Sequence, residues 1–241
     1  MEHYLFAIYV TFGAAALQGI IGFGSGLISM GMLSMLMPVS MATAVLCPLG
    51  CLISGSLTLQ HRAHLQLKSI SPLLWGIPLG IILGLLTLES LSETLLKGLL
   101  GIALLASVIN RLVGSTTIPQ LHPSVGVLMG TLAGITGTAF SASGPPVLIF
   151  ANLSGWSRDH FRANLSFVFW FCGILAIIGL SLRGVITLET LYLSATLCPG
   201  VLFGSFLGAR LGNLIPQRLF QQLALLLLTL LALRFLYGVL A

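Results

Sequence analysis

Apolar residues occur along the chain in long blocks, and charged residues or clusters of proline and glycine separate one block from the next. A helix needs about 20 apolar residues to cross the hydrocarbon core of a bilayer. The pattern therefore predicts an all-α polytopic membrane protein, a single transmembrane domain over residues 1–241 with about eight spanning helices. The predicted spans are residues 4–37, 41–60, 70–88, 93–112, 124–151, 162–181, 189–212 and 217–238.

Two of these spans are too long for one straight crossing. Residues 4–37 carry no charge and would form a helix about 50 Å long at 1.5 Å per residue. Residues 124–157 are also uncharged and just as long. Glycines interrupt the first stretch over residues 19–26, and glycine, serine and proline interrupt the second over residues 134–146. Because glycine and proline are the poorest helix formers, we predict that both spans break or kink within the membrane.

The two halves of the chain share glycine patterns. Residues 19–22 (GIIG) match residues 134–137 (GITG). Further on, the glycines that begin and end residues 80–84 match those of residues 204–208. We interpret this second pair of patterns as packing glycines, since small residues let membrane helices approach closely.

The matches predict two four-helix repeats, residues 1–113 and 122–241, each opening with a broken helix. If each repeat crosses the membrane four times, the repeats have parallel topology. A broken segment that fails to cross fully would change this topology. On the parallel arrangement the ten lysines and arginines divide equally between the two sides, so the positive-inside rule does not orient the chain.

Composition supports a membrane location. The 241 residues are 57% hydrophobic and 6% charged, whereas soluble domains are roughly a quarter charged. The net charge is +5, but the basic residues are scattered and form no run, so the sequence gives no indication of nucleic-acid binding. The positive balance fits the anionic headgroups of the lipid bilayer and, more weakly, an anionic substrate.

Acidic residues are absent from the centres of the predicted spans. Transporters that relay protons or hold metal cations usually bury such residues, so a cation site, a metal site and a cofactor are not expected. The chain also lacks the nucleophile-elbow, HExxH and phosphate-loop motifs, and we expect no catalytic residues and no enzymatic activity. The five carboxylates are Glu2, Glu89, Glu93, Asp159 and Glu189. The four cysteines, which we interpret as packing residues, are Cys47, Cys51, Cys172 and Cys198.

The two breaks predict an anion site. A helix that begins inside the membrane exposes backbone N–H groups with partial positive charge, and neighbouring hydroxyls add further donors. Arg162 opens the sixth span, where it either snorkels to the interface or helps an anion to enter. The predicted substrate-binding residues are Gly22, Gly24, Ser25, Gly26, Thr136, Gly137, Thr138, Ser141, Ser143, Gly144 and Arg162.

These motifs resemble those of the TauE/SafE sulfite-exporter family of membrane transporters. The resemblance covers nearly the whole chain and is carried by residues 19–26 (GIIGFGSG), 143–146 (SGPP) and 161–164 (FRAN). The family often has three consecutive glycines with a proline soon after, whereas here Ser25 interrupts the glycines and Pro38 comes late. The resemblance implies export, or uptake in some members, of sulfite, sulfoacetate or other organosulfonates across the bacterial inner membrane.

We therefore expect a multi-pass secondary transporter, an exporter of a small sulfur-containing anion, driven by coupling to protons or another ion. Two alternatives remain open at this stage. The same broken helices would also suit an anion channel, and the chain would also suit a membrane assembly partner that transports nothing.

Overall fold

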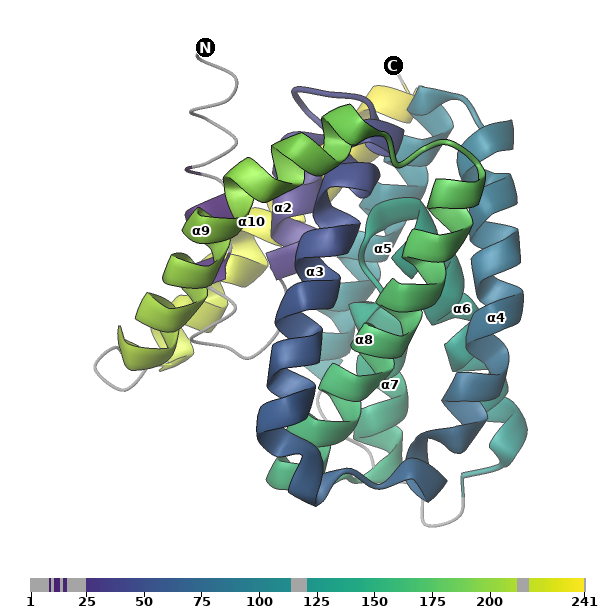
Figure 1. Cartoon of the computed structure of the whole chain (residues 1–241), viewed down its shortest axis with the longest axis vertical. Helices are drawn as coiled ribbons and strands as arrows, with labels where there is room; N and C mark the ends of the chain where they lie inside the picture. Colours follow the sequence, from purple (N-terminus) through teal and green to yellow (C-terminus); the bar gives the residue numbers. More distant parts are fainter. Residues whose placement is uncertain are drawn as a thin grey trace.

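The computed structural model describes residues 9, 11–13, 15–16, 25–113, 121–211 and 217–240, and all regular secondary structure among them is helical. An all-α fold is thereby confirmed. The helices are α2 (Ser25–Leu33), α3 (Val39–His61), α4 (Leu67–Ser90), α5 (Glu93–Val113), α6 (Pro123–Phe140), α7 (Gly144–Ser154), α8 (Arg158–Leu182), α9 (Leu188–Leu211) and α10 (Gln217–Leu240), with a 3₁₀ turn at Arg62–His64 (Figure 1).

Long apolar helices confirm a multi-pass membrane protein, but the structure does not confirm eight spans. Side chains such as Trp75 and Leu182 are at least 80% exposed on outward faces, as expected for contact with lipid. Among the described residues, the stretches long and apolar enough to cross a membrane are Val39–His64, Leu67–Ser90, Glu93–Asn110, Pro123–Phe140 and Asp159–Leu182. Shorter apolar stretches, Leu188–Gly204 and Leu228–Val239, lie within α9 and α10.

Contacts between helix ends define one side of the bundle, the upper end in Figure 1. The Glu93 carboxylate accepts the backbone N–H of Val39 at 3.0 and 3.2 Å. Arg183 forms an ion pair with Glu89 at 3.0 Å. The start of α3, the end of α4, the start of α5 and the end of α8 therefore share the upper end.

A second set of contacts defines the lower end. The side-chain oxygen of Asn164 accepts the backbone N–H of Gln66 at 2.9 Å, which joins the start of α8 to the loop between α3 and α4. The indole N–H of Trp156 donates to the Ser69 hydroxyl at 2.7 Å. The end of α3 and the starts of α4 and α8 thus lie together, with the residues that follow α7.

Helices α6 and α7 form a hairpin, so residues 124–151 are broken as predicted but do not make the single crossing that the count of eight spans assumed. A Cβ on Gly126, in the first turn of α6, would overlap Pro72 and contact the Phe150 ring of α7. The hairpin therefore begins and ends at the lower end of the bundle. The break itself falls within the predicted range, because α6 ends at a left-handed residue, Ser141 (φ 50°), and α7 restarts at a Gly-Pro-Pro sequence.

Because of the hairpin, the long helices of the second half run in the opposite direction to the corresponding helices of the first half. Helices α3, α4 and α5 run down, up and down, whereas α8, α9 and α10 run up, down and up (Figure 1). In agreement, a Cβ on Gly98 near the start of α5 would contact Val239 near the end of α10. The expectation of parallel topology therefore fails, for the reason left open above: a broken segment does not cross.

Helices α4 and α6 pack backbone to backbone through glycines. A Cβ on Gly80 would overlap the Thr131 carbonyl oxygen and lie 2.8 Å from the Gly134 Cα. One turn further, a Cβ on Gly84 would lie 2.9 Å from the Ile135 carbonyl oxygen. The interpretation of residues 80–84 as packing glycines is therefore confirmed.

Glu93 is expected to stabilise the upper end by capping α3. The residue just before α3 is Pro38, whose side chain forms no capping hydrogen bond. Glu93→Ala should lower the unfolding free energy by about 1–2 kcal/mol, because the cap on Val39 and the 3.2 Å ion pair to Lys97 are both lost. Glu93→Gln should lose less, and Glu189→Ala, at an exposed position, should change stability little. Thermal unfolding in detergent measures all three, and equal effects of Glu93→Ala and Glu189→Ala would contradict the capping role.

Candidate functional site

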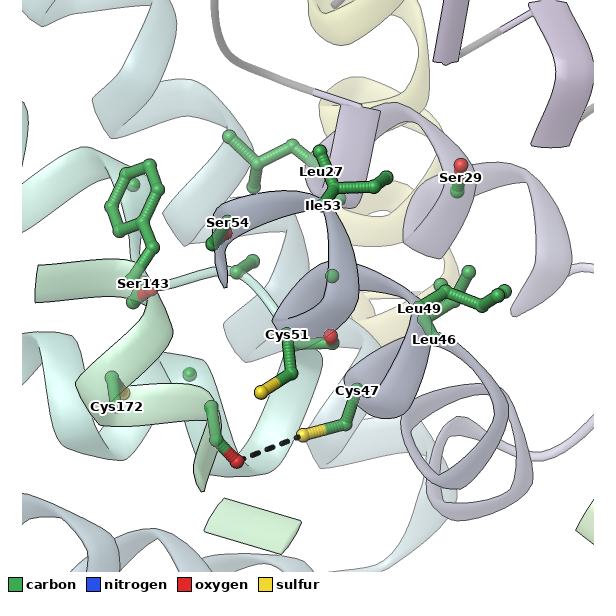
Figure 2. A pocket seen from close by; sticks show the side chains of 18 of the residues that line it. Leu27, Ser29, Leu46, Cys47, Leu49, Cys51, Ile53, Ser54, Ser143 and Cys172 are labelled. Atoms are coloured by element: carbon green, nitrogen blue, oxygen red, sulfur yellow. Dashed lines mark hydrogen bonds between the residues drawn. The ribbon is translucent and has the colours of Figure 1, made fainter. Parts of the chain in front are cut away.

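A cavity of about 100 Å³ lies where α2 meets the turn between α6 and α7 (Figure 2). The predicted break over residues 19–26 lies mostly outside the described residues. Its wall comes from the start of α2, the middle of α3, the turn between α6 and α7, and the middles of α8 and α9. Helix α2 and this turn touch there, since a Cβ on Gly26 would lie 2.7 Å from the Ser141 carbonyl oxygen. The cavity is therefore built by parts of the chain that are far apart in sequence.

One helix begins at this cavity, and another passes beside it. Helix α7 starts at Gly144 after the turn that follows α6, and α2 is described from Ser25 onward; residues of both line the cavity. From the cavity, α2 leads toward the upper end and α7 returns to the lower end. The N-terminus of α7 contributes a partial positive charge, which favours a bound anion.

The remaining polar groups of the wall are neutral. Among the described residues, none that lines the cavity is Asp, Glu, Lys, Arg or His. Hydroxyl groups come from both halves of the chain, including Ser29, Ser54 and Ser143 (Figure 2). Hydroxyls and backbone N–H groups can donate to the oxygens of an anion without placing a full charge at the membrane centre, where such a charge is costly.

Three cysteines also line the cavity, which the sequence interpretation missed. Cys47 and Cys51 come from α3 and Cys172 from α8 (Figure 2). The Cys47 thiol lies 4.0 Å from the Gly173 carbonyl oxygen, and the Cys172 thiol lies 3.8 Å from the Ala133 carbonyl oxygen. These thiols therefore pack helices together, as predicted, and also form part of the cavity wall.

The sequence of α3 contains a pattern from which this part of the cavity wall could have been predicted. Cys47, Gly50, Cys51 and Ser54 follow the i, i+3, i+4, i+7 spacing of one helix face. Small and polar residues on one face of an apolar helix indicate a surface that faces protein or a cavity rather than lipid.

The predicted site residues separate into three groups. Five of them line the cavity: Gly26, Gly137, Ser141, Ser143 and Gly144. Three lie elsewhere: Thr136, Thr138 and Arg162. The other three belong to the first break: Gly22 and Gly24 lie outside the described residues, and Ser25 begins α2 but its side chain is not described.

Packing explains why the second group lies away from the cavity. The Thr136 hydroxyl donates to the Leu132 carbonyl oxygen of its own helix at 2.9 Å. Thr138 is fully buried against Gly84 of α4. Arg162 is exposed at the lower end, about two helical turns before Phe169, which does line the cavity.

Comparison with known proteins relates the chain to a family of membrane transporters and to a curated exporter. The family model described as "Sulfite exporter TauE/SafE" matches residues 7–235. A "Probable sulfite/organosulfonate exporter TauE" from Cupriavidus necator is 26% identical over 204 residues, which cover 80% of this chain and 78% of the relative. No solved structure matches the chain.

Proposed function

The chain belongs to the sulfite exporter TauE/SafE family, and on that premise we propose that it exports a small sulfur-containing anion, such as sulfite or an organosulfonate, as a secondary transporter. The observation that carries the proposal is the N-terminus of α7 at a small cavity whose wall also holds hydroxyl groups from both halves of the chain. Anionic groups bind at such half-helix N-termini in other transporter folds. Coupling to protons or another ion supplies the driving force in this proposal.

The size and chemistry of the cavity suit a small oxyanion. Its volume of about 100 Å³ is several times the roughly 15 Å³ that one water molecule requires. Donors on opposite walls would meet the oxygens of a sulfite or sulfonate group. With no lysine or arginine in the described wall, the anion is held by partial charges alone, which allows it to be released as well as bound.

The arrangement of helices supports an alternating-access mechanism. We infer that residues 1–113 and 122–241 are two repeats of inverted topology, each contributing a broken segment to the central site. Inverted repeats with a site between them are common in secondary transporters, where one bundle rocks against the other. The proposed binding residues are those of the predicted set that line the cavity: Gly26, Gly137, Ser141, Ser143 and Gly144.

Flux measurements in proteoliposomes test the proposal. A panel of sulfite, thiosulfate, sulfoacetate, taurine and sulfate should identify at least one sulfur anion whose flux saturates and which exchanges against the same anion trapped inside. Current without exchange would instead establish a channel. Absence of flux, with no anion protecting the purified protein from thermal unfolding, would favour a membrane assembly partner.

Ser143 is expected to contribute a hydrogen bond to the bound anion. Its side chain lines the cavity and does not cap α7. A hydrogen bond to a charged group contributes about 1.5–3 kcal/mol, so Ser143→Ala should weaken anion binding by about tenfold or more. The dissociation constant is obtained from anion-dependent thermal shifts of the purified protein. Ser71→Ala is the matched control, because its hydroxyl donates to the Lys68 carbonyl oxygen on an exposed surface. Equal affinities of the two variants would remove Ser143 from the site.

A further inference from the structure

Basic residues concentrate at the lower end of the bundle. The course of the helices places five of the ten lysines and arginines there. They are Arg62, Lys68, Arg111, Arg158 and Arg162. The three at the upper end are Lys97, Arg183 and Arg234. The equal division expected from the sequence thus disappears, because the α6–α7 hairpin returns to the lower end and reverses every later helix.

Arg210 and Arg218 belong to neither group. Helix α9 leaves the upper end after Arg183 and slopes away from the bundle, and the end of α10 packs beside the start of α5 at the upper end, as Gly98 and Val239 show. The end of α9, with Arg210 in its last turn, and the start of α10, with Arg218 in its first turn, therefore lie at the side of the bundle, above its lower end (Figure 1).

Acidic residues have the opposite distribution. Glu89, Glu93 and Glu189 lie at the upper end, and Asp159 is the acidic residue of the described lower end. Two of the upper carboxylates neutralise basic partners, in the Glu93–Lys97 pair at 3.2 Å and the Glu89–Arg183 pair at 3.0 Å. The lower end of the described chain therefore carries a clear excess of positive charge, whereas the charges of the upper end balance.

We propose that the lower end of the bundle faces the cytoplasm and contacts anionic lipid headgroups there. Lysine and arginine close to the ends of membrane helices are retained on the cytoplasmic side. Each one near the surface of an anionic leaflet contributes about 1 kcal/mol of attraction. The α6–α7 hairpin then enters the membrane from the cytoplasmic side, and the loop between α4 and α5 lies outside. This orientation does not depend on the proposed substrate.

Cysteine labelling in intact cells tests the orientation. Two exposed positions at each end are replaced by cysteine: Ser92→Cys and Leu188→Cys at the upper end, and Ala63→Cys and His122→Cys at the lower end. A maleimide that cannot cross membranes should label the upper pair severalfold more strongly than the lower pair in intact cells. After cell disruption all four should react. The unmodified chain gives the background from the native cysteines, which are buried or partly buried.

The two pairs keep the test decisive. If one variant fails to accumulate, its partner at the same end still reports. Stronger labelling of the lower pair in intact cells, or equal labelling of both pairs, would overturn the orientation. Because labelling reads only the side of each residue, a negative flux result would leave this proposal standing, and inverted labelling would leave the transport proposal standing.

Discussion

Gly80→Ala is expected to destabilise the protein by about 3 kcal/mol or more, although it adds a single methyl group. The added Cβ would overlap the Thr131 carbonyl oxygen and press on the Gly134 Cα. Both obstacles belong to the backbone of α6, so no side-chain rotation relieves the overlap and the two helices must separate. Overpacking of this kind usually costs about 1–3 kcal/mol, and a rigid backbone on the other side places Gly80 at the upper limit.

Gly238→Ala is the matched control for this prediction. Gly238 lies in α10, and a Cβ there would meet nothing within 4 Å. Alanine is a better helix former than glycine by about 0.5–1 kcal/mol, so this variant should be neutral or slightly stabilised. Thermal unfolding and size-exclusion chromatography in detergent compare the two. If Gly80→Ala unfolds at the temperature of Gly238→Ala, the close approach of α4 and α6 is not needed for stability.

The sequence predicted the packing glycines because their effect is local. A Gly-x₃-Gly pattern places two small residues on one face of a helix, whatever partner that face meets. The partner could not be predicted: α4 packs on α6, and that pairing arises only when the chain has folded. The break at residues 141–143 was predictable for the same reason, because the Gly-Pro-Pro sequence that follows it acts locally. The direction that α7 takes after the break depends on contacts with distant segments and was not predictable.

Hydropathy could not distinguish a kinked crossing from a hairpin. It measures how well residues 124–151 suit an apolar environment, and both arrangements bury the same residues. What decides between them is the contact of Trp156 with Ser69 and of Phe150 with Gly126, both of which join distant segments. The error in topology then carried over to the charge distribution, which is why the basic residues seemed evenly divided.

The candidate site was predicted in part for a related reason. Ser141, Ser143 and Gly144 lie at the break itself, where any arrangement of the halves exposes them to a shared space. Thr136 and Thr138 lie within α6, and which face of that helix meets the cavity depends on how α6 rotates against α4. The thiols of α3 and α8 were missed because cysteine occurs in cavity walls as well as in packed helix interfaces, and the sequence of an apolar helix does not distinguish the two.

Gly50→Leu is expected to abolish anion binding and flux while leaving the fold intact. Gly50 lines the cavity from α3, and the nearest atom to an added Cβ would be the Ser141 hydroxyl oxygen at 4.0 Å. The branched side chain therefore projects into the cavity rather than into a neighbouring helix. Its four carbon atoms take up space that the anion needs.

The result is read from two measurements on the same sample. Without an added anion, Gly50→Leu should unfold close to the temperature of the unmodified protein, which shows that the helices still pack. With the anion that the flux panel identifies, the unmodified protein and Gly238→Leu should gain thermal stability, and Gly50→Leu should gain none. Flux in proteoliposomes should fall to the level of empty vesicles. A stable Gly50→Leu protein that still transports would place the route of the anion outside this cavity, because filling the cavity would then have no consequence.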